Sequence, residues 1–214
     1  MKLDVSFLLF SQGGSIPADH AYPIYSALSR IVPELHEQED IGIHPICGVQ
    51  SGDRRQVLTK ESRLVIRIEP ERIAMILPLA GKTIGLGSSM IQIGVPTIHG
   101  LVPSPILRSR LVTIKGFMKP ELFCEAIRRQ LDAMDVGKQV EIHLRKRRTL
   151  RIHEKEVVGF ETFLAELADE ESIRVQETGL GGRRKMGCGI PMPFKELPSK
   201  CDLFQPLSVA KGGG

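Results

Sequence analysis

The sequence predicts an α+β protein built from two ferredoxin-like βαββαβ domains in tandem, with a glycine-rich loop near the C-terminus. Segments that alternate between apolar and polar residues, as strands do, are interspersed with segments whose apolar residues recur at helical spacing. The order β-α-β-β-α-β occurs twice. A proline-rich stretch at 101–107, LVPSPIL, separates the two series and is typical of a linker. We therefore predict an N-terminal domain over residues 1–102 and a C-terminal domain over residues 108–205.

The first half begins with an alternating strand over 2–10, followed by a helix with one apolar face. That face is made by Ala21, Ile24, Tyr25, Leu28, Val32 and Leu35. Asp19 is the expected N-cap and His20 falls in the first turn, where Pro23 is tolerated because the amides there lack helical partners. The remaining elements expected in this half are strands over 41–49 and 62–70, a short helix with a turn over 70–84, and a strand over 89–98.

The second half repeats this order. A strand over 108–117 precedes a helix over 119–136, which has Leu122, Ala126, Leu131 and Met134 among its apolar positions. Residues 138–167 predict two strands around a basic hairpin. A short helix over 168–180 carries acids in its first turn, which the helix dipole favours, and a last strand covers 188–194.

Composition limits the class of protein. The chain has 214 residues, of which 42% are hydrophobic and 25% charged, as in ordinary globular proteins. No apolar run approaches the roughly 18 residues of a membrane span, and the acid within the first apolar segment argues against a signal peptide. The cysteines are widely spaced and form no C-x-x-C pair: Cys47, Cys124, Cys188 and Cys201. We expect reduced thiols in a cytoplasmic protein rather than a zinc finger or a redox motif.

The loop GLGGRRKMGCG at 179–189 places two G-x-G pairs around three cations. Gly182 and Gly187 have the first spacing of a P-loop, but Cys188-Gly189 stands where that motif needs Lys-Ser. A dinucleotide fingerprint would follow a strand and open a helix, whereas this loop leaves a helix and enters a strand. A helix C-cap followed by a glycine-tolerant turn is the alternative to a ligand-binding loop.

Basic residues cluster in the predicted hairpin: Arg145, Lys146, Arg147, Arg148, Arg151 and Lys155. A solvated hairpin tip would explain them, but like charges opposed on paired strands repel unless something anionic lies between them. Together with Arg183, Arg184 and Lys185 they favour a surface for a phosphate backbone. Aromatic residues are few, so we expect recognition of the shape and backbone of a folded RNA rather than base stacking over an aromatic sheet.

Three histidines lie in the N-terminal stretch, namely His20, His36 and His44, without the spacing of a metal site. The positive end of the helix dipole at His20 disfavours imidazolium, which leaves a neutral imidazole suited to act as a general base. Tyr25 lies further along the helix, where it would orient a substrate, donate a hydrogen bond or pack in the core.

The glycine loop fits the motif G-h-G-x5-G-h-G, in which h is apolar, from Gly179 to Gly189. With the phrases PADHAYPIYSALSRIVPELH, IGIHPI, LRSRLVTIKGFM, RRTLRI and EVVGF, the chain resembles the CRISPR repeat-processing endoribonucleases of the RAMP superfamily. It is most similar to the subgroup from myxobacterial and cyanobacterial type I systems, and the resemblance spans roughly residues 3 to 193.

The resemblance implies two RRM-like domains and an RNase that uses neither metal nor cofactor. Such enzymes cut CRISPR repeat RNA at the base of a hairpin by attack of the 2′-hydroxyl, leaving a cyclic phosphate and a 5′-hydroxyl. Many keep the hairpin bound and join other subunits of a CRISPR interference complex. His20 matches the family's helix histidine, with His44 as second choice and His36 as third. Lys115, Arg108 or Arg110 are candidates for charge stabilisation, although the sequence does not place them.

The RNA-binding residues expected from these arguments are Arg145, Lys146, Arg147, Arg148, Arg151, Gly181, Gly182, Arg183, Arg184, Lys185, Gly187 and Gly189. One alternative is a subunit of a CRISPR ribonucleoprotein that binds RNA without cutting it. Another is a general RNA-binding protein, for instance one associated with the ribosome, against which the paired G-h-G motif argues. A metal-dependent nuclease is disfavoured, because no acidic cluster with suitable spacing occurs.

Overall fold

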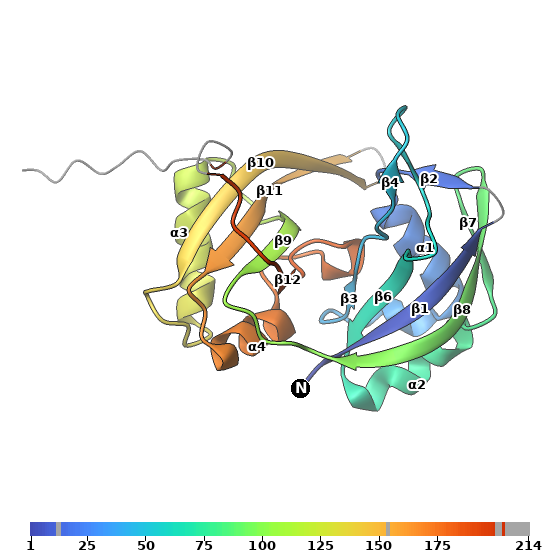
Figure 1. Cartoon of the computed structure of the whole chain (residues 1–214), viewed down its shortest axis with the longest axis horizontal. Coiled ribbons are helices and arrows are strands. Elements are labelled where there is room, and N and C mark those ends of the chain that lie inside the picture. Colours follow the sequence, from blue (N-terminus) through green and yellow to red (C-terminus); the bar gives the residue numbers. More distant parts are fainter. Residues whose placement is uncertain (12–13, 153–154, 200–202, 204–214) are drawn as a thin grey trace, which may run out of the picture.

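In the computed structural model, residues 1–11, 14–152, 155–199 and 203 are described. They form two large antiparallel sheets that lie side by side (Figure 1) and one small sheet. The strands of the N-terminal half are β1 (Leu3–Ser11), β2 (Ser15–Pro17), β3 (Gly42–Ile43), β4 (Val49–Gln50), β5 (Arg55–Val57), β6 (Arg63–Ile68), β7 (Thr83–Leu86) and β8 (Ser89–Gly100). Those of the C-terminal half are β9 (Leu107–Val112), β10 (Glu141–Ile152), β11 (Lys155–Ala165) and β12 (Met192–Pro193).

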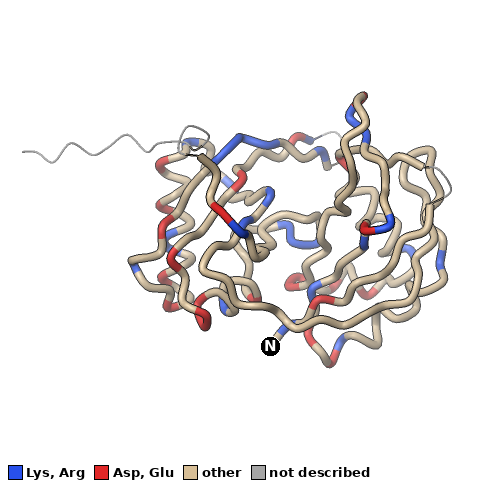
Figure 2. Tube along the Cα trace, viewed as in Figure 1, with Lys and Arg blue, Asp and Glu red and all other residues tan. Residues whose placement is uncertain are grey.

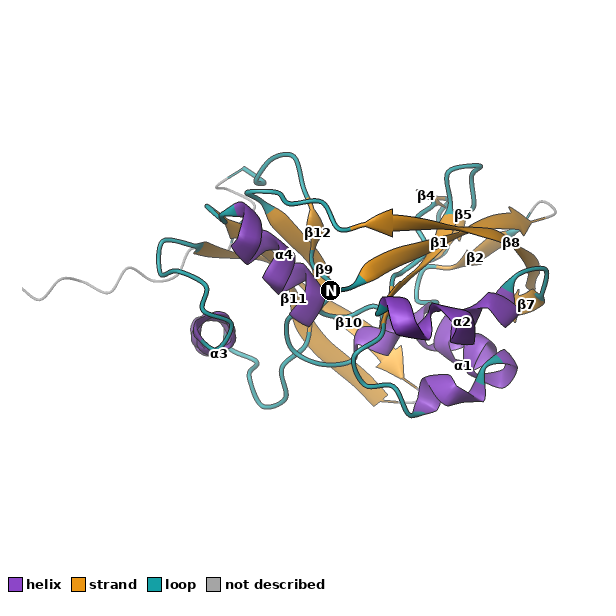
Figure 3. Ribbon diagram, turned by 90° about the horizontal axis from the view of Figure 1, so that it is seen from below, coloured by secondary structure: helices purple, strands orange, loops and turns teal. Residues whose placement is uncertain are grey.

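Helices connect these strands. The α-helices are α1 (Ala21–Ile31), α2 (Ile73–Ile76), α3 (Pro120–Asp132) and α4 (Asp169–Thr178). The 3₁₀ turns are η1 (Pro33–His36), η2 (Pro70–Arg72), η3 (Leu77–Leu79) and η4 (Arg184–Met186). Helices α1 and α2 cover one face of the N-terminal sheet, while α3 lies on the outer side of the C-terminal sheet (Figures 1 and 3).

The sheet topology confirms the predicted pair of ferredoxin-like units. The N-terminal sheet has the order β3-β6-β1-β8-β7, and the C-terminal sheet has the order β10-β11-β9-β12. In both sheets the first strand of the βαββαβ unit is central and pairs with the third and fourth. β7 is an additional edge strand that forms a hairpin with β8.

Several predicted elements differ in detail from those observed. The predicted strand over 41–49 is reduced to β3, with β4 joining β2 and β5 in a small third sheet. The predicted last strand over 188–194 shrinks to β12, because the glycine loop occupies the residues before it. Leu122 is exposed, and the buried face of α3 is instead made by Phe123, Ala126, Ile127 and Leu131.

Each sheet packs its own apolar core against its helices. One cluster of buried side chains runs from Val5 to Ile93, and a second runs from Leu107 to Leu180. A small third cluster joins Leu111, Leu150 and Cys188, with Ala21 and Met186 packed against it. This third cluster brings the start of α1 against the C-terminal half.

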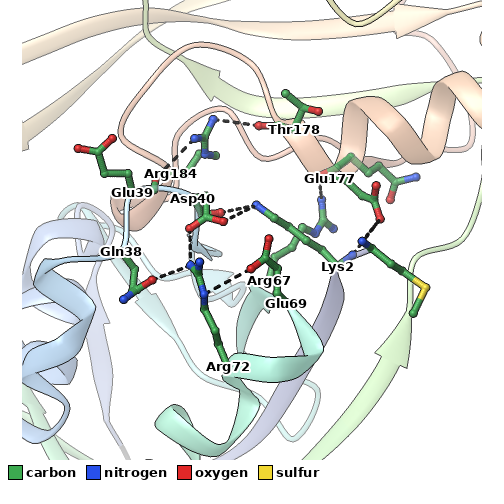
Figure 4. Close-up of polar contacts among 12 residues, drawn as sticks. Lys2, Gln38, Glu39, Asp40, Arg67, Glu69, Arg72, Glu177, Thr178 and Arg184 are labelled. Atoms are coloured by element: carbon green, nitrogen blue, oxygen red, sulfur yellow. Dashed lines mark hydrogen bonds and ion pairs between the residues drawn. The ribbon is translucent and has the colours of Figure 1, made fainter.

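Buried polar contacts also connect the two halves. Arg67 of β6 is 3% exposed, and two of its nitrogens each lie 2.8 Å from a carboxylate oxygen of Asp4. The same guanidinium donates to the carbonyl oxygens of Gln176 (3.1 Å) and Pro191 (2.8 Å) in the C-terminal half. The backbone amide of Lys2 donates to Glu177 at 2.8 Å (Figure 4). The chain therefore holds its two sheets in one defined arrangement.

Candidate functional site

The glycine-rich loop at 179–189, called the glycine loop below, starts where α4 ends and includes η4. Gly189 donates its N–H to the carbonyl oxygen of Leu111 at 2.7 Å and accepts from the N–H of Leu180 at 2.9 Å. Its φ is +62°, and a Cβ there would lie 1.8 Å from the carbonyl oxygen of Leu180. This position therefore requires glycine for the fold. Gly182 differs, since a Cβ there would meet no atom within 4 Å, although its N–H and its carbonyl oxygen are both hydrogen-bonded to Thr113.

Two of the three loop cations attach the loop to the N-terminal half. Arg184 donates to the carbonyl oxygens of Thr178 (2.9 Å) and Glu39 (3.5 Å), as Figure 4 shows. The Lys185 ammonium donates to the carbonyl oxygens of Leu35 (3.3 Å) and His36 (2.9 Å). Arg183 is exposed and adopts a left-handed backbone with φ +64°. Arg183 is thus the loop cation most available to a ligand.

A cavity of about 320 Å³, called the interdomain cavity, lies between the start of α1, the glycine loop and strands β9 and β10. The residues of its wall that bear on binding are His20, Arg54, Arg110, Arg147, Arg148 and Gly187. Asp19 also lines it, but its carboxylate accepts the backbone N–H of Arg151 at 2.9 Å. Four guanidinium groups around one carboxylate give this cavity an excess of positive charge, which suits an anion.

The predicted basic hairpin is formed by β10 and β11, and most of its cations lie along β10. Arg145, Lys146, Arg147, Arg148 and Arg151 lie along β10, and the turn at 153–154 is outside the described residues. Arg147 and Arg148 pair in register with Phe160 and Gly159 of β11, so the cations do not oppose one another across the hairpin. Figure 2 shows these positions along β10, with further basic positions in the glycine loop between the two sheets. Lys155 starts β11 and is exposed.

A fully buried carboxylate holds part of this basic surface in place. One oxygen of Glu161 on β11 accepts from Arg108 Nε at 2.7 Å, and the other accepts from Arg148 at 3.0 Å. Burial alone would raise the pKa of Glu161, but the hydrogen bonds from Arg148 and Arg108 outweigh it and lower the pKa below its ordinary value. Burial, followed by the charges of Arg148 and Arg108, lowers the pKa of the Arg110 guanidinium. An anion in the cavity would relieve this repulsion among the arginines.

His20 directly precedes α1, which begins at Ala21, and Asp19 is not the N-cap. The imidazole is 1% exposed; its Nδ1 lies 2.8 Å from the carbonyl oxygen of Pro17, and its Nε2 accepts the N–H of Ile46 at 3.0 Å. Burial lowers the pKa of His20, opposed by the Pro17 carbonyl and reinforced by Arg110. Both ring nitrogens are thus bonded to backbone, and proton transfer at Nε2 requires the Ile46 amide to move away.

His44 follows β3 and is 4% exposed. Its Nδ1 lies 3.2 Å from Met192 Sδ, and its Nε2 lies 3.6 Å from a carboxylate oxygen of Asp4. Burial lowers the pKa of His44, while Asp4 raises it and Arg67 lowers it. The imidazole belongs to the contacts between the two halves and does not line the interdomain cavity.

Tyr25 and His36 form a pair on the surface, beside the glycine loop. The Tyr25 hydroxyl lies 2.8 Å from His36 Nδ1, and the Lys185 ammonium lies 5.5 Å from the centre of the Tyr25 ring. His36 is exposed, with its Nε2 directed away from this bond. Ala21, one helical turn before Tyr25, lines the interdomain cavity, whereas neither Tyr25 nor His36 is among its wall residues.

The structure thus gathers residues that the sequence places far apart, and it adds others. Arg110, a predicted candidate for charge stabilisation, lines the cavity, whereas the exposed Lys115 is not part of its wall. Arg54 in the wall and Glu161, which contacts Arg148, were not predicted. A signal for Glu161 exists in the sequence, since it is the single acid within the apolar run VVGFETFLA of β11. Arg54 lies in a turn and carries no comparable signal.

The described ranges contain neither a metal-binding cluster nor a membrane-spanning helix. No group of three or more His, Cys, Asp or Glu side chains there is arranged to hold a metal ion. Among the helices of the same residues, none combines the length and apolar character needed to cross a membrane.

Comparisons with known proteins agree on one family. The family described as Cas6 Crispr matches residues 3–196. A CRISPR-associated endonuclease Cas6 of Myxococcus xanthus (strain DK1622) is 41% identical over 189 residues, which cover 88% of this chain and 81% of that protein. A Cas6-related protein from Pyrococcus furiosus has a similar fold, with a TM-score of 0.67 at 17% identity over 92% of this chain and all of that one. A RAMP protein described as binding different RNA substrates also has a TM-score of 0.67, at 16% identity over 91% of this chain and all of that one.

Proposed function

The chain belongs to the Cas6 family of CRISPR proteins, and we propose that it is an endoribonuclease that cleaves CRISPR repeat RNA at the base of a hairpin. The observation that carries this proposal is the interdomain cavity, where four arginines converge on one space that His20 also lines. Arginine clusters bind phosphate, and the pair of Tyr25 and His36 near the glycine loop supplies acid–base groups.

The proposed reaction needs no group beyond those of the protein and the RNA. The 2′-oxygen of the nucleotide before the cut forms a bond to phosphorus, and its proton passes to a base. The bond from phosphorus to the 5′-oxygen breaks, and this oxygen takes up a proton from an acid. The products are a 2′,3′-cyclic phosphate and a 5′-hydroxyl. Arg110 and Arg148 stabilise the extra charge on the phosphoryl oxygens, because they face the cavity at a site that excludes part of the solvent.

We assign the acid–base chemistry to Tyr25 and His36. When His36 Nδ1 carries its proton and donates it to the Tyr25 oxygen, Nε2 presents a lone pair to the surface and accepts the 2′-proton. The Tyr25 O–H is then free to donate to a phosphoryl oxygen. His20 and His44 stay as alternative bases; each requires displacement of buried contacts before its ring meets RNA.

The RNA-binding surface in this proposal is β10 with the exposed part of the glycine loop. Lys146, Arg147 and Arg183 are exposed, and the Cα of Gly182 faces open space. Retention of the hairpin product and association with further subunits of a CRISPR complex belong to the same proposal. The free thiols of Cys47, Cys124 and Cys188 fit action in the cytoplasm, whereas Cys201 lies outside the described residues.

A cleavage assay on the purified protein tests the proposal. Its own repeat hairpin should be cut in a single turnover, and cutting should persist in excess EDTA. A single 2′-deoxynucleotide before the cut should abolish cleavage while the hairpin still binds, because the nucleophile is then missing. Loss of activity with EDTA would contradict the metal-independent mechanism, and cutting of the deoxy substrate would contradict 2′-hydroxyl attack. Tight binding without any cleavage would identify a non-catalytic RNA-binding subunit.

A further inference from the structure

The open face of the C-terminal sheet carries an aromatic and arginine stack outside the interdomain cavity. It consists of Arg108 on β9, Phe163 on β11 and Phe194 directly after β12. The Arg108 guanidinium carbon lies 5.1 Å from the centre of the Phe194 ring and 5.9 Å from that of Phe163. The two rings meet edge to face at 5.6 Å. Phe194 is 37% exposed, so its ring remains accessible beside the guanidinium.

This stack is fixed before any ligand arrives. Glu161 holds the Arg108 guanidinium through two hydrogen bonds to the same carboxylate oxygen. The backbone N–H of Phe194 donates to the carbonyl oxygen of Ile106 at 2.9 Å, which anchors the segment after β12 to the sheet. A ligand that binds here meets side chains already ordered, which lowers the entropic cost of binding.

A hollow of about 520 Å³ opens beside the stack. Its wall includes Arg108, Arg145, Phe163, Phe194, Lys195 and Glu196. The volume falls within the roughly 300–1,000 Å³ of ordinary ligand pockets. Three cations against one carboxylate, combined with an accessible ring, match a ligand that is flat, aromatic and anionic.

We propose that this hollow binds one unpaired nucleotide of the RNA that flanks the repeat hairpin. The base stacks on the exposed part of Phe194, and its phosphate contacts Arg145 and Lys195. The inference rests on the proposed function for the identity of the RNA. Its geometry is independent of that identity: Glu161 contacts both Arg108 of the hollow and Arg148 of the interdomain cavity, so one carboxylate links the walls of the two sites.

The test compares two RNAs, the blunt repeat hairpin and the same hairpin with a single-stranded extension on its 5′ or 3′ side. Wild-type protein should bind one extended hairpin about 5- to 150-fold more tightly than the blunt one, as expected for one stacked base. Phe194→Leu retains apolar contact with Arg108 and Phe163 but removes the ring. It should lose that advantage while its affinity for the blunt hairpin stays unchanged. Phe194→Tyr should behave as wild type.

Two further measurements do not depend on the folding of Phe194→Leu. A 2-aminopurine placed in the extension should be quenched by wild-type protein at one position, and Lys195→Ala should weaken binding of the extended hairpin alone. The proposed subsite would be overturned if wild-type protein bound blunt and extended RNA with equal affinity. It would also be overturned if the variants lost affinity for both RNAs to the same extent. Position-specific quenching without any cleavage would refute the proposed nuclease and support the subsite.

Discussion

Burial and hydrogen bonding divide the three N-terminal histidines into two kinds. The rings of His20 and His44 are enclosed and contact backbone, sulfur or carboxylate atoms from separate segments, which suits groups that hold the fold together. The ring of His36 is exposed and bonded at one nitrogen to a phenol. A general base must come within hydrogen-bond reach of the proton it removes. The exposed ring of His36 can reach an RNA hydroxyl more readily than the buried rings of His20 and His44, which favours His36 as the base.

Replacement of the surface pair should therefore affect the chemical step. His36→Ala is expected to slow single-turnover cleavage about 10²- to 10⁴-fold, and Tyr25→Phe to slow it by a smaller factor, with hairpin affinity nearly unchanged. His99→Ala, an exposed histidine at the end of β8, is the matched control and should cleave as wild type. If His20→Ala abolishes cleavage by a folded protein that binds RNA, and His36→Ala does not, the base is His20. The hydrogen bond from the Ile46 N–H to His20 Nε2 must then break during the reaction.

Residue types were predictable from the sequence, but the partners of these residues were not. Clustered arginines and the glycine spacing predict a phosphate-binding surface without knowledge of the fold. The link between Arg108, Arg148 and Glu161 depends on the register of three strands, which places side chains from distant segments on one face. The sequence favours His20 through the family resemblance and through the dipole expected for a first helical turn. The ring instead lies before the helix, where burial dominates its pKa.

Among the elements, the glycine loop combines a structural and an exposed part. The glycines of its G-x-G pairs have positive φ values, and a Cβ at any of them would lie too close to neighbouring atoms. At Gly182, between the pairs, a Cβ would meet no atom within 4 Å. Longer elements such as α1, α3, β1 and β8 follow from local periodicity, which the sequence shows directly. Two-residue strands such as β3 and β12 exist only through their pairing with β6 and β9, and no local pattern predicts them.

Substitutions in this loop should separate its two parts. Gly189→Ala places a methyl group against the Leu180 carbonyl at a left-handed φ and should lower the free energy of unfolding by about 1–3 kcal/mol or more. Gly182→Val meets no neighbour at an ordinary φ, so its stability should lie within about 0.5 kcal/mol of wild type. Its hairpin affinity should nevertheless fall, because RNA then cannot approach the backbone closely. Urea unfolding measures the change in stability, and RNA titration measures the change in affinity. If Gly182→Val binds RNA as tightly as wild type, this part of the loop does not contact RNA and only connects α4 to β12.

At the scale of the whole molecule, the site exists only while the two halves keep their arrangement. The interdomain cavity takes residues from both halves, and so does the contact of Lys185 with Leu35 and His36. Arg67 and Asp4 are central to this arrangement, with His44 beside them (Figure 4 shows Arg67 within this network). Burial would raise the pKa of Asp4, but the hydrogen bonds from Arg67 and the nearby His44 imidazole outweigh it and hold the pKa well below its ordinary 3.8.

Acid should consequently loosen the molecule in a predictable pH window. Burial lowers the pKa of both His20 and His44 below their ordinary 6.5, with Arg110 and Asp19 facing the former and Arg67 and Asp4 the latter. Below pH 6.5 these two histidines take up protons in the unfolded chain while they stay neutral in the folded chain. The free energy of unfolding therefore falls as the pH falls. The slope contributed by each histidine is at most about 1.4 kcal/mol per pH unit. Asp4 acts in the same direction, but only below about pH 3.8.

Urea unfolding at a series of pH values between 7.5 and 5 checks this expectation. Wild-type protein should lose stability steadily below pH 6.5, and His44→Gln should show a smaller slope over that range, even if it is less stable at pH 7.5. His36→Gln is the control, because His36 is exposed and should leave the slope unchanged. A wild-type stability that is flat from pH 7.5 to 5 would mean that neither buried imidazole resists protonation. A slope that disappears in His36→Gln would place the responsible proton on the surface pair instead of between the two halves of the molecule.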